Sequence, residues 1–502
     1  MDPETVAYVT TALEQCKLLA DMYMIDYFVD NLWQQLPKSW QSFYESQLAV
    51  VAGDRTAIVA LAKHILKRPS EVSSIRLTSP EPLSMLALKA VVGNVELKQW
   101  APISKPSEAL SAVGLPSLLE SRDFTDLKKA LPPALRLKIK PKKEHEVSRI
   151  ADVAGLLIDA LPKAKINEIV DVGAGIGHLS RVLSLLLPNQ KVSTIEGDAV
   201  LVDTAAKLDE KTAKSIEFLT RRKQIEPTSS GWNPLDRKAV YVKEEHEINE
   251  SRGSNMLLTG LHTCGDFSAT ILRHFCSNSD AKVLLHFGCC YHKLNNGADK
   301  LFKDVYEDKP LVECSKGFPL SKAFGHMKLT YAAREVACFG HEQFIQKLED
   351  SISKKSFFVN CYRSILEWVI LECPKPGKGT VDSTLRHQGL RGFRGAEAMD
   401  FWQYAEEAMR DKPQVKAKFE QILTEKPHLR EEIPKMSTSE AGKTLLLYTF
   451  RLLIAPMIEA LILLDRVAFL RESGCLQAAL VPMFDPMLSP RNVALIAWKD
   501  FA

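Results

Sequence analysis

The sequence predicts an α/β fold with a seven-stranded, mostly parallel sheet, an all-α N-terminal region and a mostly helical insertion after the fifth strand. Three observations predict it. A buried strand, a glycine-rich loop, a helix and a second strand follow one another at residues 166–196. Further apolar runs alternate with helical patterns up to residue 292. Two last strand-like runs stand close to residue 500, beyond a long stretch that is mostly helical and polar.

The elements of the predicted sheet follow in chain order, each marked by a short apolar run or by helical spacing of apolar residues. The predicted strands span residues 169–172, 192–195, 239–242, 255–260, 282–288, 476–484 and 492–498. The predicted helices around them span residues 147–161, 201–214, 267–275 and 443–471. We therefore expect four segments along the chain. They are a helical N-terminal region (1–125), the first part of the core (126–292), a helical insertion (293–440) and a closing helix with two strands (441–502).

Composition limits the class of protein. The net charge of +3 is too small to indicate nucleic-acid binding by itself. The ten cysteines include no Cys-x-x-Cys pair, which predicts thiols in a reducing compartment, the cytoplasm or the nucleus. The N-terminus lacks the basic-then-apolar pattern of a signal peptide. Charged residues interrupt the apolar stretch 445–470, so we expect a buried helix there and no membrane span.

The glycine-rich loop indicates a nucleotide-like ligand. Gly173, Gly175 and Gly177 let the backbone turn sharply and approach a ligand, and Glu196 closes the second strand, where a carboxylate can bind ribose hydroxyls. A dinucleotide and S-adenosyl-L-methionine both suit this geometry. The alternating glycines and Asp171, two residues before the first, favour the second, because a carboxylate suits an amino group and a sulfonium better than a pyrophosphate. The alternative is an ordinary strand-to-helix turn.

The segment before the first strand carries Lys143, His145 and Glu146. Composition alone favours a charged linker at the start of a helix. Yet the following helix runs directly into the glycine-loop strand, and such a helix lies close to the ligand crevice in a doubly wound fold. We therefore expect these three side chains on the cofactor side.

Residues with chemical potential follow the fourth and fifth predicted strands. We expect them at the ligand-binding edge, because ligands bind outside the carboxyl ends of parallel strands. Histidine, aspartate and tyrosine are candidates for orienting an acceptor or for base catalysis, and a cysteine is a candidate nucleophile towards a pyrimidine ring. Packing is the alternative role for any single cysteine. The spacing does not match a usual zinc site, so we predict no metal. The candidates are His262, Cys264, Asp266, Cys289, Cys290, Tyr291 and His292.

These motifs together carry a resemblance. The pattern Asp-x-Gly-x-Gly-x-Gly resembles the first motif of Rossmann-type methyltransferases. In combination with Lys142-Lys143-x-His145-Glu146, Leu261-His-Thr-Cys-Gly-Asp266, Cys289-Cys-Tyr-His and Ser489-Pro-Arg-Asn492, the chain resembles the methyltransferase-like protein 25 family, also labelled ribosomal RNA adenine dimethylase domain-containing. The resemblance covers most of the chain from about residue 130. It implies a class I Rossmann-like fold, whose sheet ends with an inserted antiparallel strand, and S-adenosyl-L-methionine as cofactor.

The resemblance leaves the methyl acceptor open. RNA, methylated on a base or a ribose at the ends of strands one, four and five, is the favoured acceptor, because the His-x-Cys-Gly and Cys-Cys-x-His pair is similar to tRNA 2′-O-methyltransferases. The Asn/Asp-Pro-Pro-Tyr/Phe tetrapeptide of many amine methylases is absent after strand four. The alternatives are a protein or small-molecule methyltransferase and a catalytically silent scaffold. A phosphate-binding rim is predicted at Lys128, Lys129, Lys138, Lys140, Lys142, Lys143, Arg386, Arg391 and Arg394.

Overall fold

The structure is a computed structural model of the 502-residue chain. It describes residues 3–51, 53–67, 75–95, 102–116, 122–137, 139–225, 232, 234–242, 254–297, 317–350, 359–372, 387, 393 and 395–499. Within these ranges no helix combines the length and the apolar character needed to cross a membrane.

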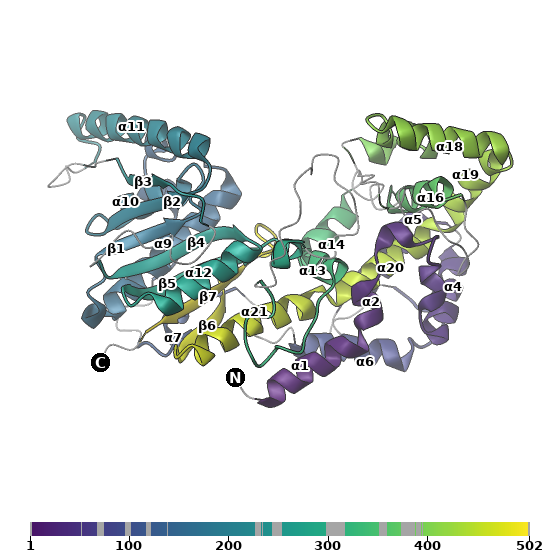
Figure 1. The fold of residues 1–502 in the computed structure, drawn as a ribbon, viewed down its shortest axis with the longest axis horizontal. Coiled ribbons are helices and arrows are strands. Elements are labelled where there is room, and N and C mark those ends of the chain that lie inside the picture. The colour runs from purple at the N-terminus through teal and green to yellow at the C-terminus, as the bar shows by residue number, and fades with distance from the viewer. Residues whose placement is uncertain are drawn as a thin grey trace.

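A seven-stranded sheet forms one end of the molecule, with strand order β3-β2-β1-β4-β5-β7-β6 (Figure 1). Its strands are β1 (Glu168–Val172), β2 (Lys191–Glu196), β3 (Asp236–Ala239), β4 (Met256–Cys264), β5 (Ala281–Cys289), β6 (Gln477–Pro482) and β7 (Val493–Trp498). The pairs β1·β2, β1·β4, β2·β3 and β4·β5 are parallel, and β7 is antiparallel to both β5 and β6. The predicted α/β fold with one inserted antiparallel strand is confirmed.

The third strand lies three residues earlier than the sequence predicted, at 236–239 instead of 239–242. It is one of the two edge strands of the sheet, and none of its four residues is fully buried. An edge strand that packs on one face need not carry the apolar run that marks a central strand, so the apolar pair Val240–Tyr241 was misleading.

Helices cover both faces of the sheet because successive strand residues point to opposite sides. Ile169 packs with α9 (Pro141–Ala160) and α10 (His178–Leu186), whereas its neighbour Val170 packs with α12 (Asp266–Ser277). The C-terminal part of α21 (Ala455–Glu472) joins the second layer through Val467 and Leu470. This arrangement leaves the carboxyl ends of β1, β2, β4 and β5 at one edge.

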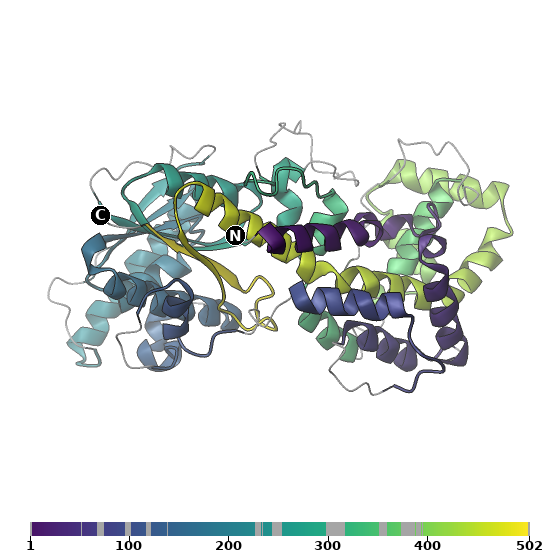
Figure 2. The ribbon, with the colours of Figure 1, turned by 90° about the horizontal axis from the view of Figure 1, so that it is seen from below.

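The other end of the molecule is helical, and α21 extends from it to the sheet (Figure 2). One core unites N-terminal helices, helices of the insertion, α20 and α21, and a second core consists mainly of helices of the insertion, with Ala441 of α20 and Phe28 packed against them. The helices of the first core include α1 (Pro3–Gln15), α2 (Lys17–Asp21), α3 (Leu32–Gln35), α4 (Lys38–Val51), α5 (Arg55–Leu66), α6 (Leu83–Val95), α13 (Tyr331–Val336), α14 (His341–Glu349) and α20 (Ala441–Leu453). Those of the second are α16 (Val359–Ile370), α17 (Phe401–Ala408), α18 (Pro413–Glu425) and α19 (Leu429–Ser439).

Two details differ from the expected segments. The short helices α7 (Ser107–Ala112) and α8 (Leu127–Ala130) pack on the sheet, so the helical N-terminal core ends by residue 95 rather than at 125. The predicted helix 443–471 is two helices, α20 and α21, divided at Ile454. Pro456 stands in the first turn of α21, where its missing N–H breaks the hydrogen-bond ladder of a continuous helix.

Candidate functional site

The glycine loop leaves β1 in a backbone conformation that only glycine adopts without strain. Gly173, Gly175 and Gly177 have φ of 77°, 57° and 74°. A Cβ on Gly173 would contact the ring of Phe267, and one on Gly177 would lie 2.5 Å from the guanidinium of Arg237. A Cβ on Gly175 would meet nothing within 4 Å. Gly175 therefore borders open space at the tip of β1.

Glu196 ends β2 directly beside this loop. Its Oε2 accepts a hydrogen bond from the backbone N–H of Gly175 at 2.7 Å, and its Oε1 accepts one from the N–H of Asp198 at 3.1 Å. A carboxylate has about four acceptor positions, so capacity remains for ligand hydroxyls. The fold thus brings together the two predicted features, the glycine loop and Glu196.

Asp171 is buried in β1, with 1% of its surface exposed. Burial raises the pKa of Asp171 to about 6, against the opposite effects of Ser180, Arg237 and Lys143. Its Oδ2 accepts no hydrogen bond from the described residues, and Nδ1 of His178 is a second buried atom without a partner there. Unsatisfied buried polar atoms are rare in native proteins and need an explanation. Two of them beside an open glycine loop fit a ligand that carries its own polar groups.

An ionic cluster behind the loop was not predicted from the sequence. Asp209 on α11 (Ala199–Arg221) pairs with Arg237 at 2.7 Å and with Arg181 at 3.1 Å. Arg181 also donates to the carbonyl oxygen of Ile176, inside the loop. The cluster holds the loop from the side away from β4. No motif signals it, because its members come from α10, α11 and β3.

Glu146 is a fully buried carboxylate at the centre of a second polar cluster. It forms ion pairs with Lys143 at 2.9 Å and with Nε2 of His262 at 2.9 Å, and its Oε1 accepts from the hydroxyl of Ser489 at 2.8 Å. Despite the opposing effect of burial, His262 and Lys143 lower the pKa of Glu146 to about 2. Glu146 is therefore ionised at neutral pH and links α9, β4 and the loop before β7.

His262 occupies an irregular position in β4. Its φ is 65°, and the pairing of β4 with β5 shifts register between Leu261 and Thr263. A bulge of this kind redirects a side chain out of the regular alternation. The imidazole is 30% exposed and is held by Glu146. A positive φ outside glycine is uncommon and often accompanies functional sites.

His145 contacts the loop before β7 through its imidazole. Its Nε2 accepts a hydrogen bond from the backbone N–H of Asp485 at 3.0 Å, so it contacts the loop that leads into β7. Burial and the charge of Arg149 lower the pKa of His145. Lys143, in contrast, acts electrostatically on both Asp171 and His178.

Three cysteines meet where β4 and β5 end. The Sγ atom of Cys264 lies 3.4 Å from those of Cys289 and Cys290, and the latter two are 3.6 Å apart. Cys289 is buried, and the other two are half-buried. Hydrogen bonds within the cluster lower the pKa of Cys290, as do the charges of His292 and Lys293. Hydrogen bonds from the same cluster, together with burial, raise the pKa of Cys289.

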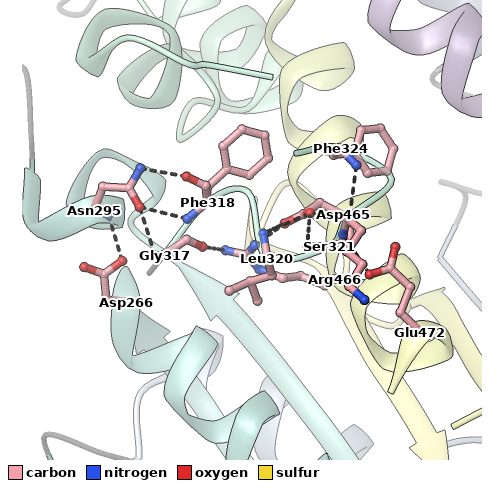
Figure 3. A network of polar contacts seen from close by, with 11 residues as sticks. Asp266, Asn295, Gly317, Phe318, Leu320, Ser321, Phe324, Asp465, Arg466 and Glu472 are labelled. Atoms are coloured by element: carbon pink, nitrogen blue, oxygen red, sulfur yellow. Dashed lines mark hydrogen bonds and ion pairs between the residues drawn. The ribbon is translucent and has the colours of Figure 1, made fainter. Parts of the chain in front are cut away.

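The remaining candidates after β4 and β5 make contacts that hold the fold. Asp266 accepts backbone hydrogen bonds from Asn295 at 2.7 Å and from Asn296 at 2.6 Å. Figure 3 shows Asp266 and Asn295 in one polar network with the segment 317–324. Tyr291 is buried and donates to Glu459 of α21 at 2.9 Å. His292 contacts the thiol of Cys338 at 3.5 Å.

Four lysines of the predicted basic rim are exposed. Lys128 and Lys129 on α8 are exposed, as are Lys140 and Lys142 at the start of α9. Lys138, Arg386, Arg391 and Arg394 lie outside the described residues.

A comparison with protein families supports the assignment of this domain. Residues 142–297 match the model of a family described as a methyltransferase domain. The matched segment contains β1 to β5, the glycine loop, Glu146 and the cysteine cluster.

Two curated relatives have the same name. "Probable methyltransferase-like protein 25" of Homo sapiens is 30% identical over 293 residues, which are 56% of this chain and 43% of the relative. The protein of that name from Mus musculus is 30% identical over 283 residues, 54% of this chain and 42% of the relative. The matched region thus spans less than half the length of either relative. A crystal structure of coclaurine N-methyltransferase bound to N-methylheliamine and SAH aligns over 56% of this chain and 64% of that chain, with 12% identity and a TM-score of 0.19.

The residues present fit the cofactor that such a domain implies. S-adenosyl-L-methionine has ribose hydroxyls for Glu196, and an amino group for Asp171, whose Oδ2 has no partner among the described residues. Gly175 leaves room for close approach. The segment 142–297 therefore matches a methyltransferase domain and has residues that fit S-adenosyl-L-methionine, and the chain is similar to the proteins named probable methyltransferase-like protein 25.

Proposed function

We propose that this chain is an S-adenosyl-L-methionine-dependent methyltransferase that modifies RNA. The observation that carries the proposal is the juxtaposition of two groups at one sheet edge. The glycine loop with Glu196 stands at the ends of β1 and β2, and the His262–Glu146 pair stands at the end of β4, the strand next to β1. A donor site and a candidate base therefore lie on neighbouring strands.

Asp171, Gly175 and Glu196 are the residues that would hold the cofactor. When bound, S-adenosyl-L-methionine supplies an electrophilic methyl group. Asp171 has a buried carboxylate oxygen available for a cationic group, and Glu196 has remaining acceptor capacity for hydroxyls. Gly175 presents backbone without a side chain to the open space above β1.

His262 is the residue that would accept a proton from the acceptor. Because Glu146 is ionised and contacts Nε2, it favours the imidazole tautomer that carries its proton on that nitrogen. Nδ1 then has a free lone pair. An ionised carboxylate on the far nitrogen also stabilises the imidazolium that forms when Nδ1 takes a proton. Glu146 is thus a positioning residue and His262 the proposed base.

Two observations support RNA as the acceptor. Exposed lysines at the start of α9, the helix that carries Glu146, provide positive charge suited to phosphates. The sequences after β4 and β5 are similar to those of tRNA 2′-O-methyltransferases, whose chemistry requires removal of a hydroxyl proton. His262 would meet that requirement.

The cofactor part of the proposal is tested by calorimetry on the intact chain. S-adenosyl-L-methionine and its homocysteine product should both bind, and Glu196→Ala should weaken binding by at least about tenfold, the equivalent of roughly one charge-assisted hydrogen bond. Asp203→Asn, an exposed carboxylate on α11, is the matched control and should bind as the wild type does. Absence of binding to the folded wild-type chain would reject the proposal.

The acceptor part is tested with tritium-labelled cofactor and separated RNA, protein and small-molecule fractions. Label should enter RNA, and nucleoside mass spectrometry should identify the modified position. His262→Asn should reduce the rate by about 100-fold or more at neutral pH, with less loss at high pH, as expected when a general base is removed. Label that enters only the protein fraction would make this a protein methyltransferase instead.

A further inference from the structure

We infer that Cys264, Cys289 and Cys290 form a binding site for a soft divalent metal ion, and that this ion is zinc. The site stands at the carboxyl ends of β4 and β5. It does not depend on the proposed methyl transfer, since it follows from the arrangement of the three thiols alone.

The geometry of the thiols fits a single ion. Zinc bound tetrahedrally at about 2.3 Å from each sulfur places the sulfurs about 3.8 Å apart. The three Sγ–Sγ distances here are 3.4, 3.4 and 3.6 Å, so movements of a few tenths of an ångström complete the triangle. A disulfide requires about 2.0 Å between sulfurs.

The backbone brings the third thiol to the other two. Cys264 and Cys289 are register partners on adjacent parallel strands, which makes them neighbours. Cys290 is next to Cys289 in sequence and would point to the opposite face in a continued strand. Instead it leaves the strand with φ of 51°, and its Sγ atom lies within 3.6 Å of both others. This explains why sequence spacing did not predict the site: the ligands come from a strand pair rather than from a Cys-x-x-Cys loop.

The donor set selects the metal class. Three thiolates favour zinc and other soft ions over magnesium or calcium, which require oxygen ligands. Among the described residues the cluster offers three ligand atoms, so the fourth position of a tetrahedral ion belongs to water or to an added ligand. Cys264 and Cys290 are half-buried, so the ion can reach the site from solvent, whereas Cys289 is 7% exposed and forms its floor. Binding releases the proton of each thiol as it becomes a thiolate.

The first experiment is a cobalt titration of the intact, reduced and chelator-treated chain. We expect a saturable thiolate-to-cobalt charge-transfer band that reaches its plateau at one ion per chain and disappears when zinc is added. Elemental analysis of protein purified without chelator should find zinc in the same ratio. If cobalt produces no saturable band, or if mass spectrometry of the fresh protein finds two of the three cysteines joined as a disulfide, the inference is wrong.

Single variants then assign the ligands. Cys264→Ser, Cys289→Ser and Cys290→Ser should each weaken zinc binding by more than about 100-fold, because even the loss of an outer-shell partner costs 10–100-fold. Cys276→Ser is the matched control, since Cys276 is a half-buried free thiol on α12 outside the cluster, and it should bind zinc as the wild type does. Should a variant not fold, zinc protection of the wild-type thiols against alkylation, mapped by peptide, gives the same assignment. Protection of other cysteines, or unchanged affinity in folded cluster variants, overturns the site.

Discussion

At the scale of single residues, the site is defined by groups that are costly to bury. Asp171 was predicted from its position before the glycines. Burial raises its pKa, so the ionised carboxylate destabilises the ligand-free fold. Ser180, Arg237 and Lys143 offset part of that cost, and of these Arg237 was not predictable. Arg237 comes from β3, a distant segment, and only the fold shows that it lies beside the loop, where Asp209 holds it. Asp266 shows a different limit of sequence analysis. Its position in a motif suggested a role in chemistry, and in the fold its carboxylate accepts backbone hydrogen bonds that hold a loop.

Asp171→Asn should stabilise the ligand-free protein at neutral pH while weakening cofactor binding. The folded-state pKa is raised from 3.8 to about 6, so folding favours the protonated carboxyl. The stability that the fold gains from the protonated carboxyl is fully present below pH 3.8 and is lost as pH rises through 6. Above that pH, the buried carboxylate lowers the free energy of unfolding by about 3 kcal/mol. Urea unfolding of both proteins between pH 4 and 8 measures it, and the stability advantage of the asparagine variant should grow with pH. A difference independent of pH would contradict the raised pKa.

Gly177→Ala should destabilise the fold more than Gly175→Ala. The two variants are a matched pair, because both residues have positive φ and both substitutions carry a strain of about 1 kcal/mol. Only at Gly177 does the new methyl group meet Arg237, which Asp209 holds in place. Gly175→Ala should instead reduce affinity for the cofactor, because its Cβ enters the open space. Thermal unfolding and calorimetry separate the two effects, and equal losses of stability would show that Arg237 moves freely.

At the scale of elements, the central strands were predictable because buried parallel strands are apolar runs bounded by turns. The position of the edge strand β3 and the division between α20 and α21 were less predictable. The first lacks a two-sided apolar environment, and the second depends on one proline. The helix α21 also has a role that its sequence pattern does not indicate. Its buried Asp465 accepts hydrogen bonds from the backbone N–H groups of Leu320 and Ser321 and thereby fixes the segment 317–324 (Figure 3).

Asp465→Ala should cost about 3–5 kcal/mol of unfolding free energy, since it leaves the guanidinium of Arg466 buried without its carboxylate partner. Glu472→Ala is the matched control. It lies on the same helix and accepts from the N–H groups of Lys322 and Ala323, but it is exposed and should cost no more than about 1 kcal/mol. Urea unfolding gives the energies, and amide exchange at residues 317–324 reports the local loss. Similar costs for both variants would mean that burial of Asp465 is unimportant.

At the scale of the whole molecule, the sequence predicted which parts are helical but not how they combine. Helices on either side of the sheet segments in sequence share one core, and Phe450 of α20 lies within it. The centroid of its ring is 4.9 Å from that of Tyr44 and 5.5 Å from that of Trp40, both on α4. Hydrophobic periodicity marks each helix as amphipathic but does not identify its partner.

Phe450→Ala should therefore loosen the N-terminal helices and not only its own. We expect a loss of about 3–5 kcal/mol, accompanied by faster amide exchange in α4 and α5. Phe218→Ala, on a ring that is 52% exposed on α11, should leave stability within about 0.5 kcal/mol of the wild type. If exchange in α4 is unchanged while α20 loosens, the shared core does not act as one unit.

The order of strands across the sheet has a consequence for synthesis on the ribosome. β5 pairs with β7, which follows it by about 200 residues. At elongation rates of about 5–20 residues per second, the outer side of β5 waits roughly 10–40 s for its neighbour. During that interval it is an apolar strand with free backbone donors and acceptors, open to pairing with other chains. Nascent copies of this protein should accordingly depend on chaperones until β7 emerges.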